Sequence, residues 1–293
     1  MSTTSVLFDA PGPRTRARHR VYSVAAAVVL LLLAVALVLF LRSQGELDYD
    51  LWEPFVTPAY VRALLVDGLL RTLEMAFSSV VLAVVFGVVF GVGKLSDHAW
   101  LRWPCLLVVE FFRAVPVLIL MIFVFFTWGA GGNGIGSYWS VVIALTLYNG
   151  SVLAEVFRAG VLAVPKGQSE AAYAIGMRKT QVMTAILLPQ AVKIMLPAIV
   201  SQCVVAVKDT SLGMYIIAPG LTRIGKSIWD EFHNHLQTAI VLAALYIVVN
   251  LLLTLAATWL QRRLVGERKQ LDVGMTAIVN AGDNSGGARG GTV

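Results

Sequence analysis

The run Val21–Leu41 contains no charged residue and is flanked by Arg20 and Arg42. As an α-helix, this run is long enough to cross a hydrocarbon core of about 30 Å. A secretory signal peptide has a shorter apolar core of about 7–15 residues, followed by a small-residue cleavage site. The run meets neither condition, so we expect an uncleaved first transmembrane helix.

Composition extends this expectation along the chain, because 58% of the 293 residues are apolar and only 14% are charged. Soluble domains are about 45–50% apolar and about 25% charged, which argues against a water-soluble enzyme. Further apolar runs lie at about Leu64–Val92, Cys105–Trp128, Tyr138–Phe157, Val192–Val207 and Thr238–Leu260. These runs lack the two-residue alternation of a transmembrane β-barrel strand. The expected fold is an all-α integral membrane protein with about six transmembrane helices.

The positive charges predict the orientation of these helices. Four arginines precede the first helix and four acidic residues follow it, namely Arg14, Arg16, Arg18 and Arg20, then Glu46, Asp48, Asp50 and Glu53. Cytoplasmic loops hold the excess of Lys and Arg, so both termini are expected in the cytoplasm. The net charge of +6 is then a topology signal rather than a sign of nucleic-acid binding.

One cytoplasmic loop carries a defined pattern: Glu170-Ala171-Ala172, three residues, Gly176, nine residues, then Ile-x-Leu-Pro ending at Pro189. Ser169 is placed to cap a helix N-terminus, where a following carboxylate is also favourable. Gly176 permits a turn or a close backbone approach. We expect Pro189 to stop a second short helix. On helix chemistry alone, an ordinary helix–turn–helix loop explains the pattern equally well.

The same pattern resembles the EAA loop of ATP-binding-cassette (ABC) importer permeases, and the chain looks closest to the polar amino acid permease family. The resemblance runs from about Leu64 to Arg263. Further stretches support it: Glu110 and Arg113-x-x-Pro116, Glu155-x-x-Arg158-Ala-Gly160, Pro165–Gln168, and Lys208-Asp209-Thr210-Ser211. Departures from the family pattern at Ala114, Val115, Leu120, Val152 and Ala159 bear on the substrate path, and leave acidic, amide and basic amino acids open.

The resemblance implies a type I ABC importer permease fold with one extra N-terminal helix. The implied segments are a basic cytoplasmic tail 1–20, the extra helix 21–41, an extracytoplasmic loop 42–60, a permease core 61–265 with coupling loop 165–189, and a disordered cytoplasmic tail 266–293. A coupling helix from about Ser169 to Met177 would dock on a separate ATPase.

The family also implies partners and a location. These are two ATPase subunits that bind the ATP and Mg, a second permease subunit that is a copy or a different chain, an extracytoplasmic substrate-binding protein, and a bacterial cell membrane. Glutamate or another acidic or amide amino acid is the expected cargo. No catalytic group, cofactor or metal is expected on this chain, whose cysteines, Cys105 and Cys203, lie inside apolar runs.

Two rival functions need the same spans. A secondary transporter or channel also uses intramembrane charges, but has no need of a cytoplasmic docking loop. A membrane scaffold or sensor subunit would use the loop for assembly without transport. Charged pairs one helical turn apart, at Glu110/Arg113, Glu155/Arg158 and Asp67/Arg71/Glu74, are expected mainly to neutralise each other on one helix face.

Two further motifs point elsewhere. Gly220 to Ser227 matches the phosphate-loop pattern, but that chemistry requires a preceding strand and a cytosolic position, whereas this segment is expected outside. His233 and His235 are two residues apart, a spacing that does not suit one helical face. We interpret both stretches as parts of an extracytoplasmic segment, 209–237, made of helical turns.

Overall fold

The computed structural model describes residues 13–265, which form helices and contain no strand. The start of the expected basic tail, 1–12, and the tail 266–293, for which disorder was expected, lie outside these described residues. The chain divides into two compact units, which are described separately. The first unit comprises Met1–Met75, Phe125–Val141 and Thr210–Ile247, and the second comprises Ala76–Val124, Val142–Asp209 and Val248–Val293.

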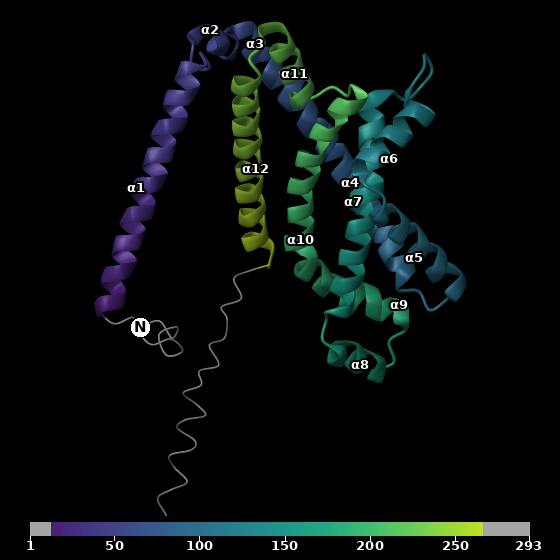
Figure 1. The fold of residues 1–293 in the computed structure, drawn as a ribbon. Helices are drawn as coiled ribbons and strands as arrows, with labels where there is room; N and C mark the ends of the chain where they lie inside the picture. Colours follow the sequence, from purple (N-terminus) through teal and green to yellow (C-terminus); the bar gives the residue numbers. More distant parts are fainter. Residues whose placement is uncertain (1–12, 266–293) are drawn as a thin grey trace, which may run out of the picture. The chain divides into compact units, whose positions relative to one another are not determined.

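The first unit contains the N-terminal helices and the segment that follows the fifth apolar run (Figure 1). Its elements are α1 (Pro13–Ser43), α2 (Tyr49–Trp52), a 3-10 turn (Glu53–Phe55), α3 (Pro58–Arg62), a π-helical segment (Ala63–Leu70), the start of α4 (Arg71–Lys94), a 3-10 segment (Thr210–Ile216), α11 (Leu221–Phe232) and the start of α12 (His235–Val265). The expected extracytoplasmic segment is therefore helical, as predicted.

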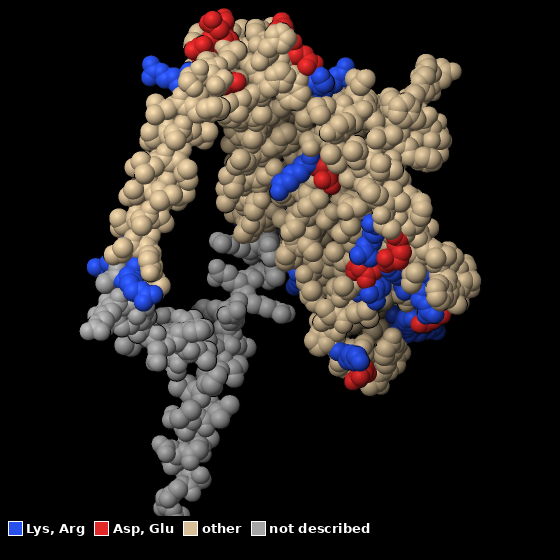
Figure 2. Space-filling model, viewed as in Figure 1, with Lys and Arg blue, Asp and Glu red and all other residues tan. Residues whose placement is uncertain are grey.

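Helix α1 is exposed on all sides between Val21 and Phe40, and the face drawn in Figure 2 shows no charged residue between the two ends of the helix. A helix that is apolar all round suits a lipid environment. The chain after α1 is fixed to the start of α12 by two buried amides. Gln237 donates to the backbone carbonyl of Glu46 at 2.6 Å, and Asn234 donates to the carbonyl of Leu51 at 2.8 Å.

The second unit contains the remaining helices. They are the rest of α4, α5 (Ala99–Ala114), α6 (Val117–Val124), most of α7 (Gly136–Leu162), α8 (Lys166–Ala174), α9 (Lys179–Gln181), a π-helical segment (Val182–Leu187), α10 (Leu188–Asp209) and the end of α12. A π-helical segment, Phe125–Gly129, continues α6 and belongs to the first unit.

The expected third span, Cys105–Trp128, is wrong as a single continuous helix. Helices α5 and α6 meet at a bend of 101°. Pro116 lies at the bend, has no N–H to continue the helical ladder, and disfavours helical geometry in the residue before it. Val115 accordingly has extended backbone angles, φ −81° and ψ 127°. Among the described residues, five helices are long and apolar enough to cross a membrane, or six if this bent pair counts as one span.

Helices α4 and α7 pack closely because glycines face bulky neighbours. A Cβ placed on Gly87 would lie 2.8 Å from Leu153 Cβ, and one on Gly91 would lie 2.9 Å from Phe157 Cβ. Gly150 of α7 faces Phe86 of α4 in the same way. Small residues at such positions let two helix backbones approach within a membrane. The Gly87-x3-Gly91 packing face therefore lies between two helices of the same chain.

Replacing Gly87 with alanine is expected to destabilise the protein by about 1–3 kcal/mol, because the added methyl group meets Leu153 inside a packed contact. The measurement is the thermal unfolding midpoint in detergent. Gly167→Ala is the matched control, since no atom lies within 4 Å of its added Cβ. Equal midpoints for the two variants would contradict the packing.

Candidate functional site

The EAA segment forms a short helix of its own, drawn beyond the end of α7 in Figure 1. This helix, α8, begins at Lys166 directly after Pro165 and ends at Ala174. The expected boundaries, Ser169 to Met177, are wrong by one helical turn. Ser169 is not the N-cap but an interior residue, whose hydroxyl donates to the carbonyl of Lys166 at 2.8 Å. Pro165 holds the N-cap position instead, with φ −54° and ψ 130°.

The three motif residues of α8 divide between its two sides. Glu170 and Ala171 are exposed, whereas Ala172 is buried. Directly after them, Tyr173 is half exposed and Ile175 is 79% exposed. The segment therefore packs through a small residue and presents a carboxylate and two large apolar side chains outward.

Gly176 makes the turn that ends this segment. Its φ is +84°, in the left-handed region that side chains disfavour. The predicted turn is confirmed. The alternative, a close backbone approach, is not seen within this chain, because no atom lies within 4 Å of a Cβ added to Gly176. A new helical run then starts at Lys179.

Pro189 does not stop this second helix, contrary to the sequence-based expectation. The helical run continues from Lys179 to Ile216. A π-helical segment precedes the proline, and the N–H of Leu188 bonds to the carbonyl of Met183, five residues back. Pro189 has no N–H to donate to the helix. The wider π-helical turn before it lets the helix continue, since helices tolerate proline where the neighbouring backbone hydrogen bonds rearrange.

The Glu155 and Glu110 motifs meet at a shared lysine that belongs to neither motif. Lys94, at the end of α4, donates to Glu155 Oε2 at 2.6 Å and to Glu110 Oε1 at 3.2 Å. Its side chain is only 5% exposed. A buried ammonium is costly unless it is paired, and the two carboxylates supply that pairing.

Each carboxylate also has the arginine expected from its own motif. Arg113 donates to Glu110 at 3.2 Å, and Arg158 Nε donates to Glu155 Oε1 at 2.9 Å. These five residues are here named the ionic cluster, and they come from α4, α5 and α7. Figure 2 shows blue and red atoms side by side in this part of the chain. The predicted helix-face pairs are confirmed, but Lys94 joins them into one group.

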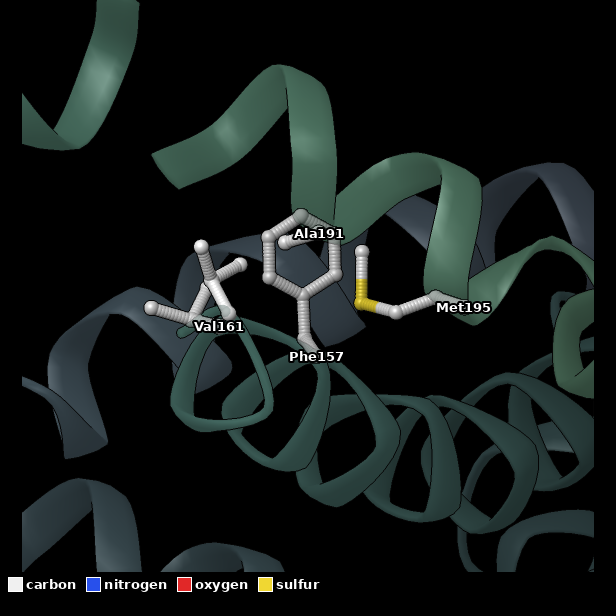
Figure 3. Packing of buried hydrophobic residues seen from close by; sticks show 5 residues of the cluster. Phe157, Val161, Ala191 and Met195 are labelled. Carbon is white, nitrogen blue, oxygen red and sulfur yellow. The ribbon is translucent and has the colours of Figure 1, made fainter. Parts of the chain in front are cut away.

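Gly160 lies in a contact between α7 and α10. A Cβ there would approach the Cγ and Sδ of Met195 within 3 Å. Around it, Phe157, Val161, Ala191 and Met195 form a buried cluster (Figure 3). The glycine of the Glu155-x-x-Arg158-Ala-Gly160 motif therefore allows α7 and α10 to pack closely.

The residues after α4 are joined to the coupling loop. Asp97 forms an ion pair with Lys179, the first residue of α9. The Lys179 ammonium holds the pKa of the Asp97 carboxyl below its usual value. Sequence reasoning missed this pair because its partners are far apart in the chain and no local pattern links them.

The Lys208–Ser211 motif lies at the end of α10. Lys208 is exposed and Asp209 ends the helix, while Thr210 is buried at the start of a 3-10 segment with Ser211 after it. In the first unit, the Thr210 hydroxyl hydrogen bonds with Tyr246. The motif thus forms a helix end rather than a single cluster of side chains.

The third predicted group of charges also forms a pair: the Arg71 guanidinium lies 2.7 Å from Glu74 Oε2. Among the residues that the structure describes, no group of three or more His, Cys, Asp or Glu residues is arranged to hold a metal ion.

The phosphate-loop pattern is not a phosphate loop. Leu221 to Phe232 is the helix α11, so Gly225, Lys226 and Ser227 lie inside it. A Cβ on Gly225 would lie 2.5 Å from Leu242 Cδ1, and Lys226 Nζ donates to Asp230 at 2.6 Å. Its glycine therefore packs against α12, and its lysine forms an exposed helix-face pair.

Lys226→Ala is therefore expected to change stability by at most about 1 kcal/mol, since exposed pairs contribute little. The measurement is the thermal unfolding midpoint in detergent. A fall as large as that expected for Gly87→Ala would contradict this assignment.

Comparison with known proteins now identifies the fold. Residues 83–266 match the family described as "Binding-protein-dependent transport system inner membrane component". The chain belongs to this permease family. The resemblance to ABC importer permeases of the polar amino acid family is thereby confirmed, as is the all-helical fold. The permease is a multi-pass inner membrane component that works with an ATPase and a binding protein. Permeases of this family are not themselves catalytic and bind no cofactor.

Individual relatives agree with this family. The permease is 41% identical over 236 residues to the glutamate transport system permease protein GluD of Corynebacterium glutamicum, covering 80% of this chain and 86% of that one. It is 35% identical to the probable glutamine ABC transporter permease protein GlnP of Bacillus subtilis, covering 69% and 94%. A solved amino acid ABC transporter with histidines superposes with a TM-score of 0.64 at 28% identity, covering 69% and 95%.

Proposed function

We propose that this permease is the membrane-spanning subunit of an ATP-driven importer for acidic amino acids, with glutamate as its cargo. The identity to the glutamate permease GluD supports this substrate. Arg71 and Arg113 each pair with a glutamate, yet each side chain is exposed by more than a third within this chain and can still be reached by an acidic substrate. Glutamine remains the first alternative, because GlnP is also similar.

The observation that carries the coupling proposal is the separate helix α8. Helix α8 contains Glu170, Ala171 and Ala172, and a left-handed turn at Gly176 follows it. Tyr173 and Ile175 project outward from this segment. Such a helix fits a groove on a separate ATPase, in which Gly176 ends the docked segment and Pro189 lies in the helix behind it. A secondary transporter does not need a cytoplasmic docking helix of this kind.

The complete importer in this proposal contains two ATPase subunits, this permease, a second permease subunit and an extracytoplasmic binding protein. ATP-driven closure of the ATPase pair rocks the two permeases between inward-facing and outward-facing states. In the moving core, Gly160 forms a helix contact, Pro116 forms the bend between α5 and α6, Arg158 pairs with Glu155, and Lys208–Ser211 ends α10. The second permease is either a copy of this chain or a different one.

We also propose that both termini lie in the cytoplasm and that 61–265 forms the permease core. In this arrangement α1 is an added anchor surrounded by lipid, which its complete exposure supports. The acidic loop after α1 lies outside, and α8 lies inside. Tags on the two termini, tested for protease access in right-side-out vesicles, should both be protected.

The substrate test uses the complex purified from its native membrane and placed in nanodiscs with its binding protein. ATP hydrolysis is measured with L-glutamate, L-aspartate, L-glutamine, L-arginine and L-histidine in turn. We expect stimulation by L-glutamate at least fivefold greater than by L-arginine. Stimulation by L-arginine alone would overturn the acidic class, and no stimulation by any amino acid would overturn the importer proposal.

A further inference from the structure

Lys94 connects three helices through one ammonium group. It lies at the end of α4 and donates to Glu155 of α7 and to Glu110 of α5. An ammonium has three donors and no fixed plane, so one lysine can serve two carboxylates at once. With Arg113 and Arg158 included, the ionic cluster has three positive and two negative charges.

The two bonds of Lys94 differ in length and in burial. The bond to Glu155 is 2.6 Å long and the Glu155 side chain is 26% exposed. The bond to Glu110 is 3.2 Å long and the Glu110 side chain is 50% exposed. A charge pair that is more exposed is better screened and weaker. The connection to α5 is therefore the weaker of the two.

Packing reinforces this difference. Helices α4 and α7 pack closely at three glycines, Gly87, Gly91 and Gly150, whereas α4 and α5 do so at one, Gly93, which faces Cys105. If the bond to Glu110 breaks, Lys94 keeps a carboxylate partner in Glu155. Helix α5 can therefore separate from the α4–α7 pair without leaving a buried ammonium unpaired.

The α4–α7 pair is joined to the proposed coupling loop, 165–189, at the end of the pair where Lys94 lies. Helix α7 ends at Leu162, four residues before α8 begins at Lys166. On the other side, the Asp97–Lys179 ion pair connects the chain after α4 to the start of α9. Helix α5 leads in the opposite direction, through the 101° bend, into α6.

We propose that Lys94 is a positioning residue that transmits movement of the coupling segment to the bent pair α5–α6. This inference rests on the proposed importer function. The α4–α7 pair moves with α8, and the Lys94–Glu110 bond determines whether α5 moves with it. Without that bond, the ATPase still docks and hydrolyses ATP, but the bent pair no longer follows.

The test measures L-glutamate taken up per ATP hydrolysed, in proteoliposomes containing the whole importer and its binding protein. Glu110→Gln is the main variant, because the half-exposed Glu110 pair contributes little to folding stability and the change removes only the charge. We expect uptake per ATP to fall at least fivefold, with the hydrolysis rate within twofold of wild type. Asp230→Asn, in the exposed pair with Lys226, is the matched control and should leave the ratio unchanged.

Lysine variants separate charge from packing. Lys94→Arg keeps the positive charge and should retain more than half of the wild-type ratio, whereas Lys94→Met should lose it as Glu110→Gln does. A wild-type ratio in Glu110→Gln would overturn the role of Lys94, and so would a fall in uptake that exactly matches a fall in hydrolysis. Failure of the wild-type importer to take up glutamate with ATP would instead overturn the proposed function.

Discussion

Replacing Gly176 with valine is expected to reduce ATP-dependent uptake at least tenfold while the permease stays in the membrane at its normal level. Gly176 has φ +84°, and a β-branched residue in that region costs about 1–2 kcal/mol or more. The turn can relax only by moving the end of α8, which displaces Tyr173 and Ile175 from their docking positions. The measurement is uptake in cells, normalised to permease in the membrane fraction.

Gly167→Val is the control for this variant, because it adds the same side chain to the same loop at a position with open space and no left-handed φ. It should retain at least half of wild-type uptake. Gly176→Asn is the second control, since asparagine tolerates the left-handed region better than valine does and should restore part of the activity. Normal uptake by Gly176→Val would remove α8 from the coupling step.

Replacing Glu155 with alanine is expected to lower stability by about 2–3 kcal/mol, somewhat below the 3–5 kcal/mol typical of breaking a fully buried pair. Glu155 accepts hydrogen bonds from both Lys94 and Arg158. Its removal leaves the buried Lys94 ammonium with only the longer bond to Glu110. The measurement is the thermal unfolding midpoint of the solubilised permease.

Asp230→Ala provides the comparison, because Asp230 and Lys226 form a pair whose side chains are both about half exposed. Such a pair contributes about 0–1 kcal/mol. Equal midpoints for Glu155→Ala and Asp230→Ala would show that the ionic cluster adds no more to stability than a surface pair.

The spans and the coupling segment were predictable because their signals are local. An uncharged apolar run such as Val21–Leu41 predicts a spanning helix without knowledge of its neighbours, and the spacing from Glu170 to Gly176 places a helix before a turn. Boundaries were less predictable. Ser169 suits a cap, but Pro165 competes for the same helix start, and sequence alone did not show which would prevail.

Pro116 and Pro189 show where sequence-based prediction of helix ends fails. The run Cys105–Trp128 is apolar throughout, so hydropathy predicts one span, although Pro116 and the restricted residue before it break the helix. Pro189 was expected to break a helix and does not, because a π-helical turn lies immediately before it. The effect of a proline depends on whether the preceding turn can widen, which is a tertiary property.

The ionic cluster was only half predictable. Spacing revealed the pairs Glu110/Arg113 and Glu155/Arg158, since residues three apart share a helix face. Lys94 is separated from its two carboxylates by 16 and 61 residues, and no local pattern links them. Its position at the end of an apolar run fits a topology signal equally well, so only the packing of α4 against α5 and α7 reveals its two partners.

The central claim is that this chain moves its cargo only when a separate ATPase acts on α8. The direct measurement is uptake of radiolabelled L-glutamate into proteoliposomes that contain the permeases with or without their ATPase subunits. We predict uptake that requires the ATPase, ATP and the binding protein together. Glutamate accumulation by the permeases alone, driven by an ion gradient, would contradict this account.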